Sequence, residues 1–227
     1  MVASSDQPHS DINFSTCLGI HLRVALFNLI EFVRVLWRYY RSPCFLMIDV
    51  LLRCSYLFKN LYRISKERGH IYGETPLTTL DLIAQKCRIL SKDIVFDLGC
   101  GTGRVVFWLS HFVGCETYGV DIHPLFIERA TWLKHIGKVD KLMFFHQDIA
   151  EINLDKATVI YLYGTTMSDE MIYLMIEKFR QLSSGIKIIT VSFALQDYCS
   201  EGLFEMKKSF QVRFPWGTAE VFLQTLK

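Results

Sequence analysis

An acidic residue followed by three alternating glycines carries the clearest chemical signal in this sequence. A short apolar run ends in Asp97, and Gly99, Gly101 and Gly103 follow it. Glycines in such a turn let the backbone approach a ligand closely and adopt positive φ, which a side chain resists. Arg104 stands where the dinucleotide fingerprint Gly-x-Gly-x-x-Gly has its third glycine. The segment therefore predicts a site for a nucleotide-like cofactor other than NAD.

Two further acids follow two further apolar segments. Residues 116–121 end in Asp121, and residues 142–148 end in Asp148. A carboxylate about twenty residues beyond a nucleotide-binding turn can accept hydrogen bonds from both ribose hydroxyls of an adenosine, which is the role that we expect for Asp121. The alternative is that Asp121 caps the helix that Pro124 begins.

The elements that must position these acids alternate between strand and helix. The alternation predicts an α/β fold with a parallel, doubly wound sheet. A continuous apolar run over 158–163 is typical of a strand buried on both faces, and a helical pattern follows it. The later expected elements are the helix 168–182, the strand 186–192, and the strands 204–214 and 219–226, which a turn at 215–218 joins into a C-terminal antiparallel hairpin.

The run from Asp97 to Gly103 resembles motif I of the class I S-adenosylmethionine-dependent methyltransferases. The resemblance extends from about residue 70 to the C-terminus, and it implies a Rossmann-like, seven-stranded sheet, methyl transfer and S-adenosylmethionine as the cofactor. It also implies that Asp97 lies at the amino-acid end of the cofactor and Asp148 near the adenine. The cofactor-binding residues expected are Tyr72, Thr75, Asp97, Gly99, Cys100, Gly101, Asp121, Ile122, Asp148, Ile149 and Tyr161.

A second resemblance narrows the chemical class of the expected methyl acceptor. Residues 70–76, His-Ile-Tyr-Gly-Glu-Thr-Pro, resemble the Tyr/Thr-Pro segment of a subgroup that includes the ATP synthase c-subunit lysine methyltransferases and the non-SET histone methyltransferase domain, as do residues 161–164 and 188–193. The sequence departs from the subgroup at residues 101–104, where Gly-Thr-Gly-Arg replaces Gly-Asp-Gly-Arg, and it lacks a Pro-rich loop after Tyr163. This resemblance implies an acceptor amine, with a protein lysine as the candidate.

Methyl transfer from a sulfonium requires alignment of the acceptor rather than strong acid–base help. An acceptor amine must arrive uncharged, and an aromatic wall can depress its pKa. The candidate catalytic residues are Tyr163, Tyr72 and Glu74, with Tyr161 as a further wall residue and Glu74 as the nearest base; the alternative is that the tyrosines only pack. Gly73 and Pro76 bracket Tyr72 and Thr75 in a turn, so we expect these two polar side chains to close over the cofactor.

The 227 residues divide into three parts. We expect a disordered tail over 1–17, a basic and apolar helical extension over 18–70, and the methyltransferase domain over 71–227. Net charge is only +2, which does not favour nucleic acid as a partner. The extension, however, has nine Lys or Arg against three acids, a local balance of +6.

The extension is also intensely apolar and divides at Ser42-Pro43. On a helix, the basic residues and Glu31 occupy a narrow arc, and a wide apolar face lies opposite, comprising Leu22, Leu26, Leu29, Val33, Leu36, Trp37 and Tyr40. No uncharged run approaches the roughly 18 residues of a spanning helix, and residues 1–16 lack the basic start of a signal peptide. Two compatible roles remain: peripheral binding of residues 18–66 to an anionic membrane, or a lid on the catalytic domain.

Seven scattered cysteines without zinc spacing favour a reducing cytoplasm and no metal site. Two alternatives to amine methylation stay open at this point. One is methylation of a small lipophilic molecule or lipid, which the apolar extension would suit. The other is a non-catalytic module that binds cofactor or serves as a membrane scaffold. The sequence leaves the oligomeric state open.

Overall fold

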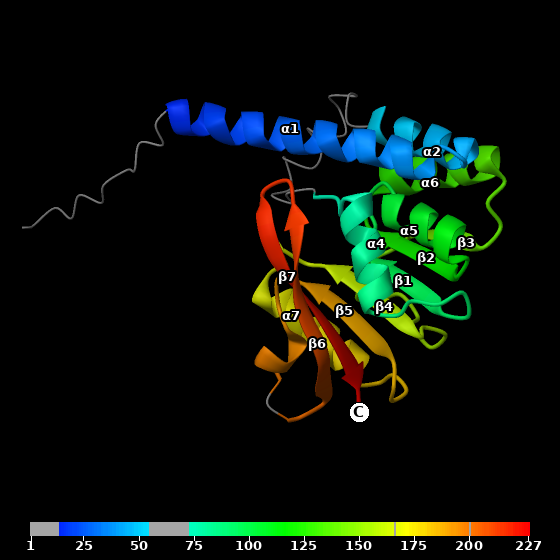
Figure 1. Cartoon of the computed structure of the whole chain (residues 1–227). Coiled ribbons are helices and arrows are strands. Elements are labelled where there is room, and N and C mark those ends of the chain that lie inside the picture. The colour runs from blue at the N-terminus through cyan, green and yellow to red at the C-terminus, as the bar shows by residue number, and fades with distance from the viewer. Residues whose placement is uncertain (1–13, 55–72, 166, 200) are drawn as a thin grey trace, which may run out of the picture.

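Seven strands form one sheet in the order β3-β2-β1-β4-β5-β7-β6 in the computed structural model of the chain, which describes residues 14–54, 73–165, 167–199 and 201–227 (Figure 1). The strands are β1 Ile94–Leu98, β2 Glu116–Asp121, β3 Leu142–His146, β4 Val159–Tyr163, β5 Lys187–Val191, β6 Phe204–Phe214 and β7 Gly217–Leu226. The helices are α1 Phe14–Tyr39, α2 Pro43–Cys54, α4 Leu77–Lys86, α5 Arg104–Trp108, the π-helix η2 Leu109–Val113, α6 Pro124–Gly137, α7 Asp169–Phe179 and the 3-10 helix η3 Leu195–Asp197.

The first five strands are parallel and the last two are antiparallel. β1 lies at the centre between β2 and β4, and β7 pairs antiparallel with both β5 and β6. The chain therefore reverses its order of strand addition beside β1, which is where open α/β sheets bind their ligands. The predicted doubly wound sheet with a C-terminal hairpin is confirmed.

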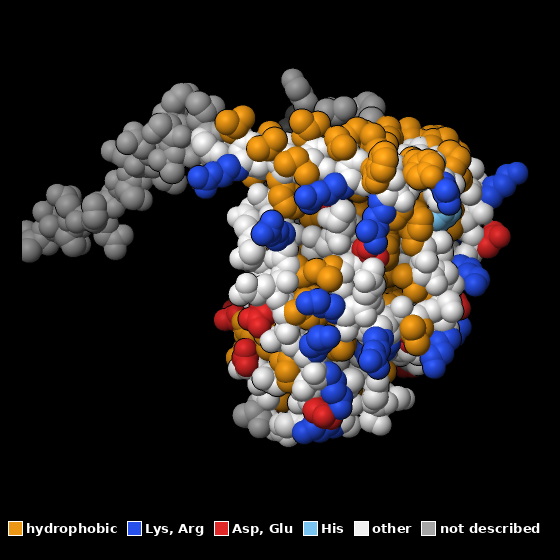
Figure 2. Space-filling model, in the orientation of Figure 1, with side chains coloured by type: hydrophobic (Ala, Val, Ile, Leu, Met, Phe, Trp, Pro, Cys, Tyr) orange, Lys and Arg blue, Asp and Glu red, His pale blue; other side chains and the backbone are white. Residues whose placement is uncertain are grey.

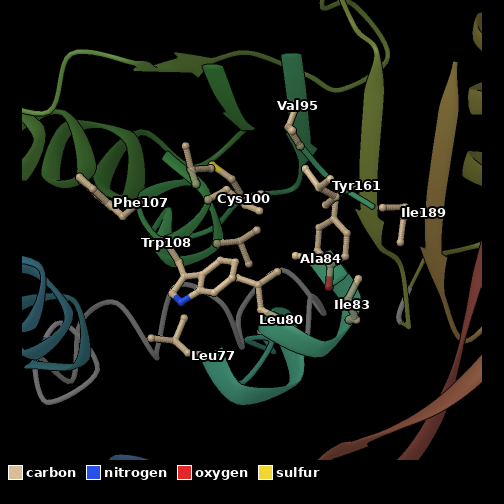
Figure 3. Packing of buried hydrophobic residues seen from close by; sticks show 14 of the residues in the cluster. Leu77, Leu80, Ile83, Ala84, Val95, Cys100, Phe107, Trp108, Tyr161 and Ile189 are labelled. Atoms are coloured by element: carbon tan, nitrogen blue, oxygen red, sulfur yellow. The ribbon is translucent and has the colours of Figure 1, made fainter. Parts of the chain in front are cut away.

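Two hydrophobic clusters cover the two faces of the sheet. One combines Tyr161 and Ile189 of the sheet with α4, α5 and α6, and Figure 3 shows the Tyr161 ring pointing from β4 towards α4. The other combines the alternate β4 residues Ile160 and Leu162 with α7. Because side chains alternate along a strand, both Tyr161 and Tyr163 lie on the first face.

Helices α1 and α2 pack over the first face of the domain, and the break between them falls at the predicted Ser42-Pro43. Val35 and Tyr39 of α1, and Phe45 and Ile48 of α2, belong to the same buried cluster as α4 and the sheet. The Tyr39 hydroxyl accepts a hydrogen bond from Trp108 Nε1 at 2.9 Å. The extension thus shares a core with the domain that contains the sheet.

The wide apolar face predicted for the first helix points away from the domain. All seven of its residues are exposed, from 37% for Leu36 to 84% for Trp37. Figure 2 shows these hydrophobic side chains gathered along α1, with Lys and Arg side chains below them. Glu31, which the helical arc groups with the arginines, is instead buried against α4. No helix among the described residues is long and apolar enough to cross a membrane.

A few element boundaries differ from the prediction. α7 ends at Phe179 rather than Leu182, and the last residues before Gly185 form turns. Ser168 caps α7 by accepting a hydrogen bond from Met171 N at 3.3 Å. The hairpin turn is shorter than predicted, because Phe214 already pairs with Gly217 across it.

Candidate functional site

The glycine-rich turn leaves the carboxyl end of β1 and begins α5. Gly99 has φ +82°, and a Cβ placed there would meet no atom within 4 Å, so this backbone borders open space. Gly103 has φ +83°, and a Cβ there would lie 2.5 Å from the Phe144 ring. One glycine therefore exposes the backbone to a ligand, whereas the other permits close packing on β3. The role of the third dinucleotide glycine falls to Gly103, one residue before Arg104.

Asp97 is buried at the end of β1 and has an oxygen without a partner. Its side chain is 3% exposed, and its Oδ2 accepts no hydrogen bond from the described residues. Burial, together with the nearby Asp121 carboxylate, raises the pKa of Asp97 to about 8. An orphaned buried carboxylate is costly unless a ligand donates to it. The ammonium of an amino-acid tail would satisfy this oxygen, so the residues present fit S-adenosylmethionine.

Asp121 lies at the end of β2 and ties two parts of the site together. Its Oδ2 accepts from Gly101 N at 2.7 Å and its Oδ1 accepts from His123 N at 2.8 Å. The residue that precedes α6 is His123, so Asp121 is not the helix N-cap of the alternative reading. Each carboxylate oxygen can accept more than one hydrogen bond, so these contacts leave room for the hydrogen bonds expected from the ribose hydroxyls.

The residues expected near the adenine lie at the ends of neighbouring strands. Asp148, just beyond β3, accepts from Ala150 N at 2.9 Å, and Ile149 packs against the cluster that includes α7. Ile122 is half exposed beyond β2, and its carbonyl lies 3.0 Å from His146 Nε2. Cys100 is buried in the turn, and burial raises the pKa of its thiol. These positions stay predictions for cofactor contact.

Thr75 lies in the segment that precedes α4, and its placement corrects one expectation. The expectation was that the turn presents polar side chains rather than core ones, but Thr75 is 2% exposed, and its Oγ1 lies 2.7 Å from the Tyr161 hydroxyl. Tyr161 is itself buried, and burial raises the pKa of its hydroxyl. In the sheet register Tyr161 pairs with Asp97 on β1, so this buried hydrogen bond borders the cofactor end of the sheet. Tyr72 lies outside the described residues.

Both carboxylate oxygens of Glu74, the candidate base, have partners. Its Oε1 accepts from Thr102 Oγ1 at 2.6 Å, and its Oε2 lies 3.6 Å from Arg104 Nη1. Arg104 also donates from Nε to Asp49 Oδ1 at 2.6 Å. Burial disfavours the charged guanidinium, but Asp49 and Glu74 outweigh this effect and raise the pKa of Arg104. Glu74 is thus a partner of the glycine-rich turn, and its role as a base stays a prediction.

Tyr163 belongs to an aromatic stack at the carboxyl end of β4. Its ring lies 5.3 Å from that of Phe214, which lies 5.2 Å from Trp216, and Trp216 Nε1 donates to the Tyr163 hydroxyl at 3.2 Å. A Cβ at Gly73 would lie 2.9 Å from the Tyr163 ring. The segment before α4 and the C-terminal hairpin therefore meet at Tyr163, and Tyr163, Phe214 and Trp216 form one aromatic wall.

Three residues that line or support the site were not predicted from the sequence: Trp216, Asp49 and Glu31. Trp216 was placed in a hairpin turn, where an exposed aromatic beside a strand end is the available signal. Asp49 and Glu31 carry no local signal, because their partners are 55 and 47 residues away. Among the described residues, no group of three or more His, Cys, Asp or Glu could hold a metal ion.

Comparisons with known proteins agree with this geometry. Residues 97–201 match the family described as "ANTKMT methyltransferase domain". A protein-lysine N-methyltransferase of Saccharolobus islandicus is 25% identical over 129 residues, which cover 56% of this chain and 79% of that protein. An H3 lysine-79 specific histone-lysine N-methyltransferase of Dictyostelium discoideum is 25% identical over 162 residues, which cover 65% of this chain but only 8% of that much longer protein.

A solved structure has the same fold. The RNA methyltransferase of Salinibacter ruber, in complex with S-adenosyl-L-homocysteine, superposes with a TM-score of 0.55 at 24% identity, over 67% of this chain and 93% of that one. Motif I, the sheet order, the buried acid at the end of β1 and the family match lead to one conclusion. The chain has the fold and the cofactor turn of the class I S-adenosylmethionine-dependent methyltransferases.

Proposed function

We propose that this chain transfers a methyl group from S-adenosylmethionine to the side-chain amine of a protein lysine. The support is the match of residues 97–201 to the ANTKMT methyltransferase domain, combined with similarity to a protein-lysine methyltransferase. The observation in the site that carries the proposal is the aromatic wall of Tyr163, Phe214 and Trp216 at the carboxyl end of β4.

The cofactor supplies a methyl group activated by a sulfonium. Asp97 accepts from the ammonium of its amino-acid tail, Gly99 lets the backbone approach it, and Asp121 accepts from its ribose. Asp121 also holds Gly101 N, so one carboxylate couples the ribose position to the shape of the turn. The residues of this chain orient the cofactor and the acceptor, and they do not exchange protons with them.

The aromatic wall acts on the acceptor. A lysine amine attacks with its lone pair and is therefore reactive only after it has lost its proton. Apolar rings next to the amine disfavour its charged form and lower its pKa. Tyr163 is half-buried and Trp216 is exposed, so an amine can reach the wall from solvent. The hydroxyl of Tyr163, held by Trp216, orients the amine.

The acceptor class is testable with a labelled methyl group. We would incubate the full chain and radiolabelled S-adenosylmethionine with isolated membranes, and then separate protein from the organic-phase lipids. The proposal expects label in protein that acid hydrolysis releases as methyl-lysine. Label in the organic phase would support a lipophilic acceptor instead. Cofactor binding without label in either fraction would support a non-catalytic module. Asp97→Asn is the inactive control.

We also propose that the outer face of α1 binds an anionic membrane peripherally. The support is that seven large apolar side chains point away from the domain while arginines lie beside them, as in helices that lie in a membrane interface. Val35, Tyr39 and Glu31 hold the opposite face of α1 on the domain. The same helix therefore serves as a cover for the domain and as a membrane contact, and it brings the active site to membrane proteins.

Point variants of the full chain test this contact. Trp37→Ser and Leu29→Ser remove apolar area from the exposed face without touching the core, so we expect co-sedimentation with anionic vesicles to fall while the melting temperature stays unchanged. High salt should weaken the binding of the unmodified chain, because each basic residue near an anionic surface contributes about 1 kcal/mol. Leu90→Ser, at an exposed site beside β1, is the control. Equal sedimentation of all variants would refute the proposal.

A further inference from the structure

A chain of polar contacts connects the N-terminal extension to the glycine-rich turn. Asp49 of α2 accepts from Arg104 Nε at 2.6 Å, and Arg104 Nη1 lies 3.6 Å from Glu74 Oε2. Glu74 Oε1 in turn accepts from Thr102 Oγ1 at 2.6 Å. Thr102 lies between Gly101 and Gly103, so the chain of contacts ends inside the cofactor turn.

The first two groups of this chain of contacts, Asp49 and Arg104, are deeply buried. Asp49 is 1% exposed and Arg104 is 5% exposed. A buried guanidinium requires negative charge beside it, and removal of one carboxylate leaves it under-compensated. It then moves towards the carboxylate that remains. Arg104 without Asp49 has Glu74 as its remaining carboxylate in an ion pair among the described residues, so Glu74 is drawn away from Thr102.

We propose that Asp49 is a positioning residue for cofactor binding, through which α2 of the extension completes the cofactor site. Asp49 fixes Arg104, Arg104 holds Glu74, and Glu74 holds the hydroxyl of Thr102 and hence the shape of the turn that receives the amino-acid end of the cofactor. The second Asp49 oxygen accepts from Arg53 Nε at 2.9 Å, which orients the carboxylate towards Arg104. The inference rests on the cofactor assignment, and it is independent of which acceptor is methylated.

Calorimetry with S-adenosylhomocysteine on the full chain tests the proposal. Asp49→Asn keeps the shape of the side chain and removes its charge, so we expect the dissociation constant to rise about tenfold, as for the loss of a charged hydrogen bond. The matched control is Asp81→Asn, because Arg38 of α1 pairs with Asp81 of α4 and this ion pair also joins the extension to the domain. It should change the melting temperature without changing the dissociation constant.

A double replacement distinguishes a role of Asp49 in cofactor affinity from a role in stability alone. In Asp49→Leu/Arg104→Met an apolar pair replaces the buried ion pair, and such replacements often recover stability. We expect the melting temperature to return towards that of the unmodified chain, while cofactor affinity stays weakened because residue 104 then no longer pairs with Glu74. Recovery of affinity together with stability would overturn the proposal, and so would an unchanged dissociation constant for Asp49→Asn.

Amide hydrogen exchange of the unmodified chain tests the same proposal and does not depend on whether a variant folds. S-adenosylhomocysteine should slow amide hydrogen exchange in α2 around Asp49 as well as in residues 99–104. If protection rises only in residues 99–104, α2 is not coupled to the turn and the proposal fails. If the unmodified chain does not bind S-adenosylhomocysteine at all, the cofactor assignment fails instead, and the two failures are distinguishable.

Discussion

At the scale of single residues, the cofactor site depends on a carboxylate that is poorly placed without its ligand. Asp97 is buried, has an unpartnered oxygen, and has a pKa of about 8. Its pKa in the unfolded chain is about 3.9. Between these values the folded, ligand-free protein holds one proton more than the unfolded chain, so its stability falls as pH rises. In the proposed contact with the cofactor ammonium, Asp97 would stabilise the complex at the expense of the empty protein.

Replacement of Asp97 should change the stability of the ligand-free protein and its affinity for the cofactor in opposite directions. We expect Asp97→Asn to raise the melting temperature of the ligand-free protein at pH 8 and to have little effect near pH 4, where the native carboxyl is already protonated. The same variant should lose S-adenosylhomocysteine binding, because a neutral amide does not pair with an ammonium. Thermal melts across this pH range measure the first effect. A variant that is less stable than the unmodified chain at pH 8 would contradict the raised pKa.

Proton linkage gives a second test of Asp97. The acid is protonated in the empty site at pH 7 and ionised beside a bound ammonium, so binding should release about one proton and the affinity should increase as pH rises towards 8. At still higher pH the amine of the ligand loses its own proton, so affinity should fall again. Calorimetry in buffers of different ionisation enthalpy measures the released proton. A heat of binding that does not depend on the buffer would exclude this linkage.

Asp121 combines ligand binding with support of the turn. Asp121→Ala removes the acceptor expected for the ribose and also the acceptor of Gly101 N. Loss of charged hydrogen bonds costs about 1.5–3 kcal/mol, or roughly tenfold to over a hundredfold in affinity. We expect the dissociation constant of S-adenosylhomocysteine to rise by that factor, with Glu128→Gln on the exposed side of α6 as the control. Unchanged affinity would refute the assignment of Asp121.

At the scale of elements, one helix caps another from a distance. α4 begins after Pro76 and has no side-chain cap of its own. Glu31 of α1 supplies one, because its Oε1 accepts from Thr78 N at 3.0 Å and its Oε2 accepts from Thr78 Oγ1 at 2.6 Å. A carboxylate at a helix N-terminus also interacts favourably with the helix dipole. α1 is therefore bound to the domain by a buried charge as well as by apolar contacts.

The Glu31 contact predicts a loss of stability on substitution. Glu31→Ala leaves Thr78 N without its acceptor and removes the charge from the start of α4, so we expect the free energy of unfolding to fall by about 1–2 kcal/mol. Denaturant titration measures the change. Glu177→Ala, at an exposed surface ion pair of α7, is the control and should cost less than about 1 kcal/mol. Equal losses in the two variants would show that Glu31 caps nothing.

At the scale of the whole molecule, the extension and the catalytic domain share one core. The buried cluster on the first face of the sheet includes α1, α2, α4, α5 and α6. The division at residue 70 therefore separates stretches of sequence that pack together in space. We expect a chain that starts at Gly69 to melt at a lower temperature than the full chain and to bind S-adenosylhomocysteine more weakly. An equally stable, fully binding fragment would show that the extension is dispensable for both.

The sequence by itself determined the alternation of strands and helices, the cofactor turn and the three acids near successive strand ends. These features are local: apolar runs define the strands, glycines define the turn, and the carboxyl ends of parallel strands meet at one edge. The break between α1 and α2 was predictable for the same reason, because a proline begins a helix more readily than it continues one.

Only the tertiary structure decided which face of α1 is buried and what Arg104 does. The sequence left open whether the wide apolar face of α1 contacts a membrane or packs on the domain, and in the structure the domain takes the face that carries Glu31, Val35 and Tyr39. From the sequence, Arg104 is only a departure from the dinucleotide fingerprint, whereas in the structure Asp49, 55 residues earlier in the chain, compensates its buried charge. Both outcomes depend on contacts between segments distant in sequence. The energy of a buried charge depends on which partner the fold brings beside it, and residue spacing alone does not contain that information.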